Sequence, residues 1–485
     1  MPQMYPGRNR STLARLGDTN SAAKVHENRT TRMFLTFTPA AAFRAISVFI
    51  ASVLTLVSGA EGQSLGSGAD EQWPSYRHDL FNSGFAKSSY DPRTVKLQQR
   101  WTYAADSYIT STPTQADGFV YAGTWNGDVL ALDAATGALR WRAHLGANPD
   151  EVYGGPRGVI GAISIDNGTI FAASGNCTIA AFDARRGKQR WRRTICDIAR
   201  NDDLYASPVV AGGLVLIGVS MLDDRPTDRG REIALDAATG AVRWEIEPAR
   251  YRGTGTGITA SPAVDVLARR VYLGTGNPTP ANSPPAGDDP GSDSVLALDL
   301  TTGKTIWSYG PVHPHDVNDD DFMASPNLFN AGSDAQPKWA IGEGNKDGAY
   351  YVVGIDTGMF LWRRVLAPGS QSAMIVGTAA VGNGAVYVPL YNGTVGSLSA
   401  LRTTDGAVMW QQPTGGEYEA PVLWGSVVFT TEACGWLDAF SAGTGKPLGR
   451  WHLCGRAMGR GPSVARGGLY VAAGKCLTYF AATRS

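Results

Sequence analysis

Four carboxylates crowd into one short stretch of this 485-residue chain. The stretch HPHDVNDDDF, residues 313–322, contains within six positions Asp316, Asp319, Asp320 and Asp321. Like charges this close disfavour one another's ionisation, so the group needs either water or a cation. Acidic runs usually face solvent, but these residues would equally suit a cation site or a catalytic base beside its metal. All three interpretations stay open until the surrounding elements are considered.

The elements around this stretch follow a repeat that ends in tryptophan. An apolar pair and an aspartate, as in ALDAATGALRW, precede a glycine turn and then the tryptophan. Clear or weaker copies end at Trp141, Trp191, Trp244, Trp307, Trp362, Trp410 and Trp451. Their spacing of 41 to 63 residues is typical of solenoids and propellers. Alternating apolar runs such as GLVLIGVS precede the copies and predict strands, while the glycine of the turn supplies a positive φ.

Each unit predicts four short antiparallel strands, which form one propeller blade. The tryptophan opens a strand and packs between neighbouring sheets. Trp101 has no complete unit before it, and the stretch after Trp451 supplies three strands without a tryptophan. We therefore expect the N-terminal strand at Trp101 to complete the last blade. The predicted fold is all-β, an eight-bladed β-propeller with tryptophan-docking repeats, whose closure removes exposed sheet edges.

The bulk composition limits the classes of partner. The chain has 43 basic and 43 acidic residues, so its net charge gives no reason to expect nucleic acid or an anionic membrane. It contains 59 glycines and only 18% charged residues, a mixture that suits many short strands joined by tight turns. The same mixture argues against a disordered chain.

Residues 1–60 are interpreted as an N-terminal extension and signal peptide, and residues 61–485 as the propeller. Arg44 precedes the apolar run AISVFIASVLTLVSGA, whose small final residues suit cleavage before Glu61. The residues before Met33 are polar and basic, so Met33 is an alternative true start. A membrane anchor is the other interpretation, although the apolar run is short for a span. We expect a secreted or periplasmic protein with no stable span after leader removal.

The five cysteines suggest cross-strand disulfides. Cys177 and Cys196 flank the turn DARRGK, and Cys434 and Cys454 flank the turn SAGTGK, so each pair should face across a hairpin. Two such disulfides would agree with an oxidising compartment. Five buried free thiols are the alternative, and Cys476 is left without a role.

The repeat ALDxxTGxxxW, spread over residues 70–485, resembles that of the quinoprotein alcohol dehydrogenases. These enzymes use pyrroloquinoline quinone (PQQ) and fold as eight-bladed propellers. Non-catalytic propellers, such as the scaffold used in outer-membrane protein assembly, carry the repeat too, so the site residues must decide the function. The stretch GVSMLDDRPTDRGREIALD is most similar to the polyvinyl-alcohol dehydrogenase branch.

The resemblance implies a metal site. In YLGTGNPTP, Asn277 matches an asparagine whose carbonyl ligates calcium, while Asp223 and Asp224 match an acidic ligand of the family with a side chain one carbon shorter. HDVND resembles the His-Asp-x-Trp-Asp segment, so Asp319 matches the catalytic base and metal neighbour, although Asn318 stands where tryptophan is usual. Asp321 matches an acid of several members, including those that use a lanthanide. Acids and an amide carbonyl are the oxygen ligands that calcium prefers.

The resemblance also implies a cofactor site. Lys346, in GNKDGAYYVVGIDTG, matches the cation that contacts the quinone oxygens, and Arg157, in GGPRGVI, matches an arginine near the quinone end. The stacking tryptophan of the family is replaced by Ile258 and Thr259, and no adjacent cysteine pair exists to cover the other face. In the implied reaction the metal and Arg157 polarise the quinone, Asp319 takes the hydroxyl proton of an alcohol, and Lys346 stabilises the reduced oxygen.

The implied partners are an alcohol, small or polymeric, and an external electron acceptor such as a soluble cytochrome c, because no Cys-x-x-Cys-His haem motif is present. Two other functions remain open. One is a non-catalytic propeller that binds proteins or polymers, which the missing stacking pair favours. The other is a propeller hydrolase that uses the acidic loop and a metal, although no nucleophile with a partnered histidine stands out.

Overall fold

The computed structural model describes eleven stretches of the chain, which are residues 72–87, 96–152, 155–221, 230–248, 257–276, 291–311, 320–367, 373–392, 395–416, 419–456 and 461–483. The chain forms two compact units, Met1–Ser64 and Leu65–Ser485, and all described residues belong to the second. The predicted leader and its cleavage point therefore lie outside the described residues. Within the described stretches, no helix has the length and apolar character needed to cross a bilayer.

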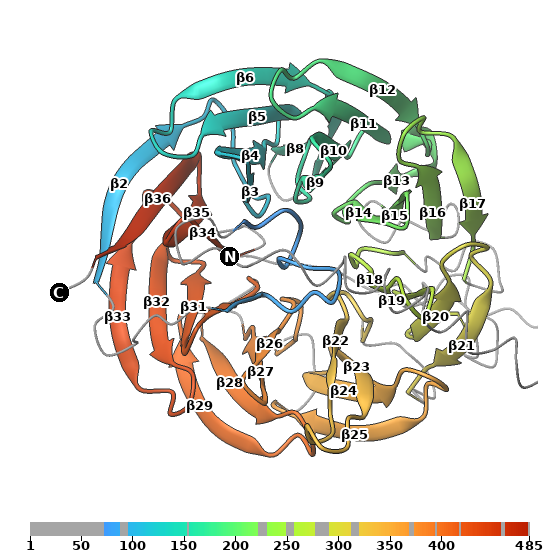
Figure 1. Ribbon diagram of the computed structural model, residues 1–485, viewed down its shortest axis with the longest axis vertical. Coiled ribbons are helices and arrows are strands. Elements are labelled where there is room, and N and C mark those ends of the chain that lie inside the picture. The colour runs from blue at the N-terminus through green and yellow to red at the C-terminus, as the bar shows by residue number, and fades with distance from the viewer. Residues whose placement is uncertain are drawn as a thin grey trace, which may run out of the picture. The chain divides into compact units, whose positions relative to one another are not determined.

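Seven blades of four antiparallel strands follow one another along the chain and stand side by side around a ring (Figure 1), and the sheets of blades 3 and 7 each gain a fifth strand. Blade 1 contains β3 (Thr114–Ala116), β4 (Phe119–Gly123), β5 (Asp128–Asp133) and β6 (Leu139–His144). Blade 2 contains β9 (Ser164–Asp166), β10 (Thr169–Ser174), β11 (Thr178–Asp183) and β12 (Gln189–Thr194). Blade 3 contains β14 (Val209–Ala211), β15 (Leu214–Met221), β16 (Arg231–Asp236) and β17 (Val242–Ile246). Blade 4 contains β18 (Ala263–Asp265), β19 (Arg270–Gly274), β20 (Val295–Asp299) and β21 (Thr305–Tyr309).

The remaining blades repeat this order. Blade 5 contains β22 (Asn327–Asn330), β23 (Trp339–Gly344), β24 (Ala349–Gly354) and β25 (Phe360–Val365). Blade 6 contains β26 (Ala380–Gly382), β27 (Ala385–Leu390), β28 (Gly396–Arg402) and β29 (Val408–Thr414). Blade 7 contains β30 (Val422–Trp424), β31 (Val427–Glu432), β32 (Trp436–Ser441) and β33 (Pro447–His452). Short elements between blades are β7 (Asn148–Val152), β8 (Gly155–Arg157), η2 (Ile198–Arg200) and β13 (Asp202–Asp203).

The eighth blade joins the two ends of the propeller. Its inner strands are β34 (Ser463–Ala465), β35 (Gly468–Ala473) and β36 (Cys476–Thr483), and its outer strand is β2 (Lys96–Ala104). Trp101 of β2 lies opposite Tyr479 of β36. The predicted eight-bladed propeller, closed by the N-terminal strand at Trp101, is therefore confirmed.

Trp101 and the six tryptophans that end the repeats of blades 1 to 6 each fasten their blade to the next one. Each ring lies against the turn glycine of the following blade, so that a Cβ built on Gly303 would sit 2.7 Å from the ring of Trp244. Each indole N–H also donates to a backbone carbonyl of that blade, as from Trp244 to Leu300 at 2.9 Å. Six further tryptophans make the same indole-to-carbonyl bond, namely Trp101, Trp141, Trp191, Trp307, Trp362 and Trp410. Only glycine leaves room for the ring at this turn.

Removing one of these rings should destabilise the propeller strongly. Trp244→Ala is expected to lower the free energy of unfolding by about 3–5 kcal/mol, because it empties a buried aromatic site and leaves the Leu300 carbonyl without its donor. Trp451→Ala is the matched control, since Trp451 ends a repeat but blade 8 offers it no glycine turn. Urea unfolding of both variants measures the difference. Equal losses would contradict the docking role.

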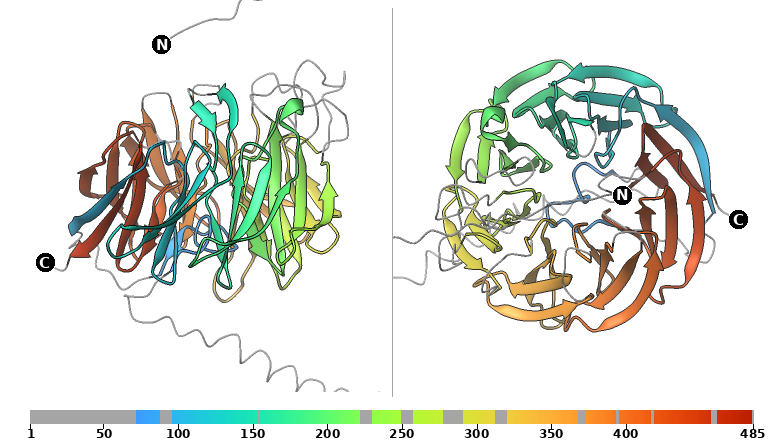
Figure 2. Two further views of the ribbon diagram at one scale, coloured as in Figure 1. Left: turned by 90° about the horizontal axis from the view of Figure 1, so that it is seen from above. Right: turned by 180° about the vertical axis from the view of Figure 1, so that it is seen from behind.

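The segment 72–87 crosses the middle of the ring and touches the inner strands of successive blades (Figures 1 and 2). Backbone bonds join it to blade 1 at Gln115, to blade 4 at Val264 and to blade 7 at Leu423. Arg77 is almost completely buried there, and its guanidinium donates to the carbonyls of Ala379 and Pro421. Burial lowers the pKa of Arg77 to about 10. β1 (Phe85–Ala86) then pairs parallel to β30. This segment thus ties the inner strands together.

The cysteines pair differently from expectation in one case. Cys177 and Cys196 form the predicted disulfide, but Cys454 is bonded to Cys476, so the predicted Cys434–Cys454 disulfide is wrong. The reason is an offset of one residue. The carbonyl that receives the N–H after β12 belongs to Cys177, whereas the equivalent carbonyl in blade 7 belongs to Gly435. The Cys434 thiol instead contacts the Glu432 carboxylate at 3.0 Å.

Candidate active site

All described site residues lie on one face of the ring. Antiparallel strands place the link into each inner strand, and the turn between the second and third strands, at the same end of a blade. Backbone bonds join these two elements, as from Gly175 to Gly158 at 2.9 Å in blade 2 and from Lys346 to Asp321 at 3.1 Å in blade 5. We call this end of the propeller the linker face. It gathers residues that are far apart in sequence.

Asp321 and Lys346 form an ion pair on the linker face. The Lys346 ammonium lies 2.8 Å from Oδ1 of Asp321, and each side chain is only 12% exposed. Lys346 stands in a tight turn that the sequence itself stabilises, because the Asn345 side chain accepts from the Asp347 N–H at 2.7 Å and Gly348 has a positive φ. The turn therefore holds the Lys346 ammonium beside the Asp321 carboxylate, which lies in the link between blades 4 and 5.

Two glutamates are buried near this region, and burial raises the pKa of each well above its usual value. Glu343, in β23, lies against Gly274 of blade 4, where a Cβ would meet its carboxylate at 2.1 Å. The negative charge of Asp321 raises the pKa of Glu343 further. Glu232, in β16, lies opposite Gly218 of β15. Both carboxyl groups therefore keep their protons to a higher pH than an exposed glutamate does.

Neutral Glu232 gives a testable pH dependence. The unfolded chain ionises this carboxyl group at its usual pKa, whereas burial in the folded protein raises the pKa. The free energy of unfolding should therefore fall as the pH rises above about 4.5. Glu232→Gln is expected to raise the melting temperature at pH 8 and to leave it unchanged at pH 4. A variant that is less stable at pH 8 would show that Glu232 is ionised and paired.

Arg157 is held by a buried acid. One of its terminal nitrogens lies 2.7 Å from Oδ2 of Asp203, with side-chain exposures of 8% and 0%. Asp202, the neighbouring residue in β13, forms a second pair with Arg231 at 2.6 Å. β13 is an added strand beside β15 of blade 3. Arg157 therefore connects the link between blades 1 and 2 with the sheet of blade 3. The Arg157 Nε has no hydrogen-bond partner among the described residues.

Ile258 and Thr259 lie in the link between blades 3 and 4. Ile258 is fully buried in a core cluster that contains Leu216, Ala234 and Leu273, and its side chain fills the space above Gly218. Thr259 is only half-buried. Of the two residues, Thr259 is the one with surface available to a ligand.

The remaining predicted site residues lie outside the described residues, namely Asp223, Asp224, Asn277 and Asp319. The same holds for Asp316, whereas Asp320 is described and buried. Within the described stretches, no group of three histidine, cysteine or acidic residues is arranged to hold a metal ion. The metal site thus stays a prediction.

Sequence reasoning did not single out Asp203, Glu232 or Glu343. Asp203 precedes blade 3 in NDDLYASP, with nothing in its spacing to connect it with Arg157. Glu232 stands at a position where Val129 and Val295 occupy blades 1 and 4. The sequence signal that could have identified Glu232 is an acid at a repeat position that is apolar in these other blades.

The family model described as "Glucose/ethanol/alcohol dehydrogenase, beta-propeller domain" matches residues 73–375, which is more than half of the chain. A second model, "Outer membrane protein assembly factor BamB", matches residues 346–457. A polyvinylalcohol dehydrogenase from Pseudomonas sp is 25% identical over 83% of this chain and 73% of its own length. A quinate/shikimate dehydrogenase (quinone) from Acinetobacter baylyi is 25% identical over 61% of this chain, which spans 44% of that relative.

Solved structures agree on the fold. The quinohemoprotein alcohol dehydrogenase from Comamonas testosteroni superposes with a TM-score of 0.73 at 19% identity, over 87% of this chain and 82% of that one. A europium-containing methanol dehydrogenase gives 0.72 at 18% identity, over 83% and 90%. BamB from Moraxella catarrhalis gives 0.59 at 16% identity, over 80% and 100%.

Proposed function

Because this chain belongs to the PQQ-dependent dehydrogenase β-propeller family of oxidoreductases, we propose that it is an exported quinoprotein that oxidises an alcohol to a carbonyl compound. The observation that carries the proposal is the Asp321–Lys346 ion pair on the linker face, which places an acid next to a cation. The two disulfides support export, since such bonds persist in oxidising compartments.

The described residues suit a flat, anionic quinone. Arg157 has N–H donors beyond the one that faces Asp203, and Lys346 brings an ammonium group to the same face. The buried Nε of Arg157 and the buried side-chain amide nitrogen of Asn345 both lack a hydrogen-bond partner among the described residues. Thr259 supplies a half-buried side chain from the blade 3–blade 4 link. PQQ, when bound, would supply the two-electron acceptor that amino-acid side chains do not provide.

Two acids compete for the role of base. Asp319 is the residue that the family motif favours, and Asp321 is the residue that lies beside a cation. We assign the hydroxyl proton of the alcohol to a carboxylate oxygen of Asp321, because a neighbouring ammonium favours the ionised form that a base requires. Asp319 is then proposed as a metal neighbour.

The metal is proposed from the chemistry of its ligands. Asp223, Asp224, Asn277 and Asp319, with Asp321 at the edge, provide the carboxylate and carbonyl oxygens that calcium prefers, and a lanthanide suits the same oxygen-rich set. The bound cation would neutralise part of the acidic stretch. The Coulomb repulsion among its aspartates would then fall.

The substrate is proposed to be a primary, secondary or polymeric alcohol, with polyvinyl alcohol suggested by the relative from Pseudomonas. Two electrons leave for each alcohol oxidised, so an external acceptor such as a soluble cytochrome c is required. No nucleic acid is expected as a partner, because the net charge is zero.

Dye reduction by purified protein tests this function. The protein is loaded with PQQ and either calcium or a lanthanide, and electron transfer to an artificial dye is followed with primary alcohols, secondary alcohols and polyvinyl alcohol. We expect reduction that needs PQQ, metal and alcohol together. Absence of reduction with every metal and alcohol would contradict the proposal. It would favour a binding scaffold, the alternative that the match of the BamB family model to residues 346–457 supports.

A further inference from the structure

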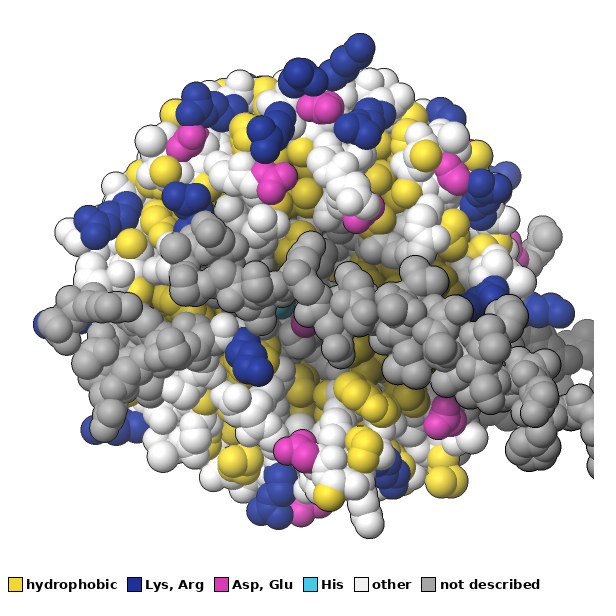
Figure 3. Space-filling view, viewed as in Figure 1, with side chains coloured by type: hydrophobic (Ala, Val, Ile, Leu, Met, Phe, Trp, Pro, Cys, Tyr) yellow, Lys and Arg dark blue, Asp and Glu magenta, His cyan; other side chains and the backbone are white. Residues whose placement is uncertain are grey.

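Blade 2 carries an unusual concentration of positive charge on its outer edge. The third strand, turn and fourth strand, residues 178–194, contain one acid, Asp183, and six basic residues, Arg185, Arg186, Lys188, Arg190, Arg192 and Arg193. In each of blades 1 and 3 to 7 the corresponding stretch contains no more than two Lys or Arg residues. Figure 3 shows Lys and Arg side chains gathered along the edge of the disc where β6 and β12 lie. We call residues 185–193 the basic edge.

Among the described residues, acids pair with only part of this charge. Arg190 pairs with Asp183 at 3.3 Å, but Arg192 and Arg193 donate to the backbone carbonyls of Leu145 and Thr239 at 2.9 and 2.7 Å. A carbonyl fixes the guanidinium in place without cancelling its charge, and a guanidinium has five N–H donors. The basic edge therefore presents arginines that are oriented and still able to bind an anion.

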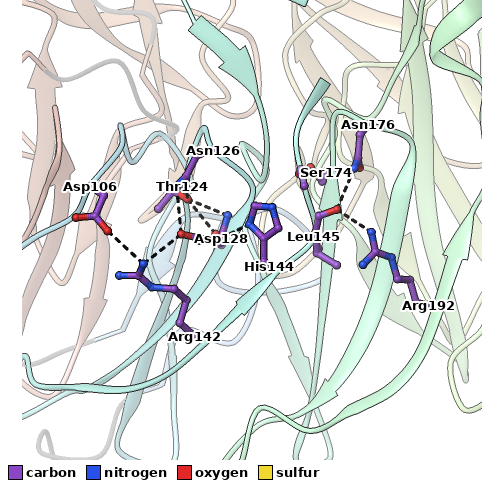
Figure 4. Close-up of polar contacts among 11 residues, drawn as sticks. Asp106, Thr124, Asn126, Asp128, Arg142, His144, Leu145, Ser174, Asn176 and Arg192 are labelled. Atoms are coloured by element: carbon purple, nitrogen blue, oxygen red, sulfur yellow. Dashed lines mark hydrogen bonds and ion pairs between the residues drawn. The ribbon is translucent and has the colours of Figure 1, made fainter. Parts of the chain in front are cut away.

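Blade 1 shows the contrast, as Figure 4 illustrates. On its outer strand, Arg142 lies 3.2 Å from Asp106 and 3.7 Å from Asp128. His144 lies 2.8 Å from Asp128, so the polar residues at this end of blade 1 compensate each other. Arg192, on the next outer strand, contacts only the Leu145 carbonyl in the same view. The excess of positive charge thus lies on blade 2 and not on blade 1.

A groove of about 450 Å³ adjoins the basic edge, between the outer strands of blades 2 and 3. Arg193 lines one side, and Glu245, which lies 3.5 Å from Arg231, lines the other. The apolar lining includes Ile195 and Val242, and Val242 is 53% exposed. The groove thus offers room for one apolar side chain between a fixed arginine, Arg193, and one acid, Glu245.

Protection of a sheet edge does not explain this charge. Lysine and arginine on an edge strand do discourage pairing with other chains, and β12 is the edge of its sheet. However, β17 and β21 are edges of the same kind and carry at most one basic residue each, Arg243 on β17. β12 alone carries three, Arg190, Arg192 and Arg193, which is more than β17 and β21 need as edge strands.

We propose that the groove and the basic edge form a docking site for an acidic peptide segment of a partner protein, with one apolar side chain of the segment seated against Val242 and Ile195. Charge complementarity selects the acidic segment, and the adjoining groove gives a place for an anchor. An anionic membrane would use the same cations, but it has no side chain to fill the groove, so the structure favours a peptide. β12 can also add a strand through its free edge.

Fluorescence anisotropy of a labelled peptide tests the site in the full chain. The probe is a synthetic peptide with acidic side chains around one central leucine, at low ionic strength, and saturable binding that salt weakens is expected. The variant Arg186→Glu/Arg193→Glu should weaken it at least about tenfold. The matched control is Lys304→Glu/Lys446→Glu, which changes the net charge equally on exposed turns of blades 4 and 7 and should leave binding unchanged.

Three results would overturn the proposal. The first is absence of peptide binding at low ionic strength. The second is equal loss in the two double variants, which would mean that only net charge matters. The third is binding to vesicles of anionic phospholipid without binding to the peptide, which would assign the basic edge to a membrane surface. A peptide whose central leucine is replaced by serine should bind more weakly, and equal binding would contradict the role of the groove.

Discussion

Asp321→Asn should reduce kcat/KM for alcohol oxidation by about 10²–10⁴-fold, the usual contribution of a positioned general base. The amide keeps the shape of the side chain but cannot accept the hydroxyl proton, and it breaks the ion pair with Lys346. Dye reduction under saturating PQQ and metal gives the rate. The protein should remain folded, because the amide oxygen can still accept a hydrogen bond from the Lys346 ammonium.

Asp319→Asn and Lys346→Met complete this experiment. If Asp321 is the base, Asp319→Asn should weaken metal binding, so that a higher metal concentration restores activity. Lys346→Met should lower kcat, with partial recovery in Lys346→Arg, because arginine keeps the positive charge. Full activity of Asp321→Asn together with an irreversible loss in Asp319→Asn would contradict our assignment and return the role of base to Asp319.

Arg157→Met should destabilise the fold by about 3–5 kcal/mol, because it leaves the Asp203 carboxylate buried without its cation. The matched variant is Arg157→Met/Asp203→Asn, which removes both charges. Most of the lost stability should return in this double variant, while PQQ binding should stay weak, since the guanidinium is absent. Urea unfolding measures the first effect, and PQQ titration measures the second.

The outcome of this double variant separates a structural role from a ligand-binding role. If Arg157 serves only the fold, the double variant should bind PQQ as the original chain does. If Arg157 contacts the cofactor, stability and binding should separate. Equal stability of the single and double variants would contradict the importance of the buried pair.

The propeller could be predicted from sequence because its information is local and repeated. Each unit carries its own turn glycine and tryptophan, and the structure places the Trp244 ring on Gly303 as the repeat implies. Closure followed from counting strands at the two ends, which Trp101 and β36 confirm. The order of eight blades thus needed no information about contacts between distant residues.

The cysteines show where a local pattern is insufficient. Cys434 and Cys454 flank a turn much as Cys177 and Cys196 do, but their separation is one residue longer. In a hairpin, one residue changes the side on which a side chain stands. Cys476 comes from blade 8, so its pairing with Cys454 depends on how two blades are placed. The positions of cysteines around the turn of one hairpin could not predict a disulfide between two blades.

The candidate site was predicted in part for the same reason. Lys346 and Asp321 belong to motifs with a recognisable order, and the structure brings them within 2.8 Å. Asp203 and Glu343 belong to no recognisable sequence motif. They matter to the site because each is buried against a residue that is distant in sequence, and the sequence pattern does not show this. The core position of Ile258 likewise depends on Gly218 of the neighbouring strand, which no spacing indicates.

Titration of the purified protein with PQQ in the presence of calcium, followed by isothermal calorimetry, tests the central claim most directly. We predict saturable binding of one PQQ per chain, and binding at least about tenfold weaker in Lys346→Met, which loses a charged hydrogen-bond donor to an anionic ligand. A rise in melting temperature should accompany binding. Absence of saturable binding with calcium and with a lanthanide, or equal affinity in Lys346→Met, would contradict a quinoprotein site on the linker face.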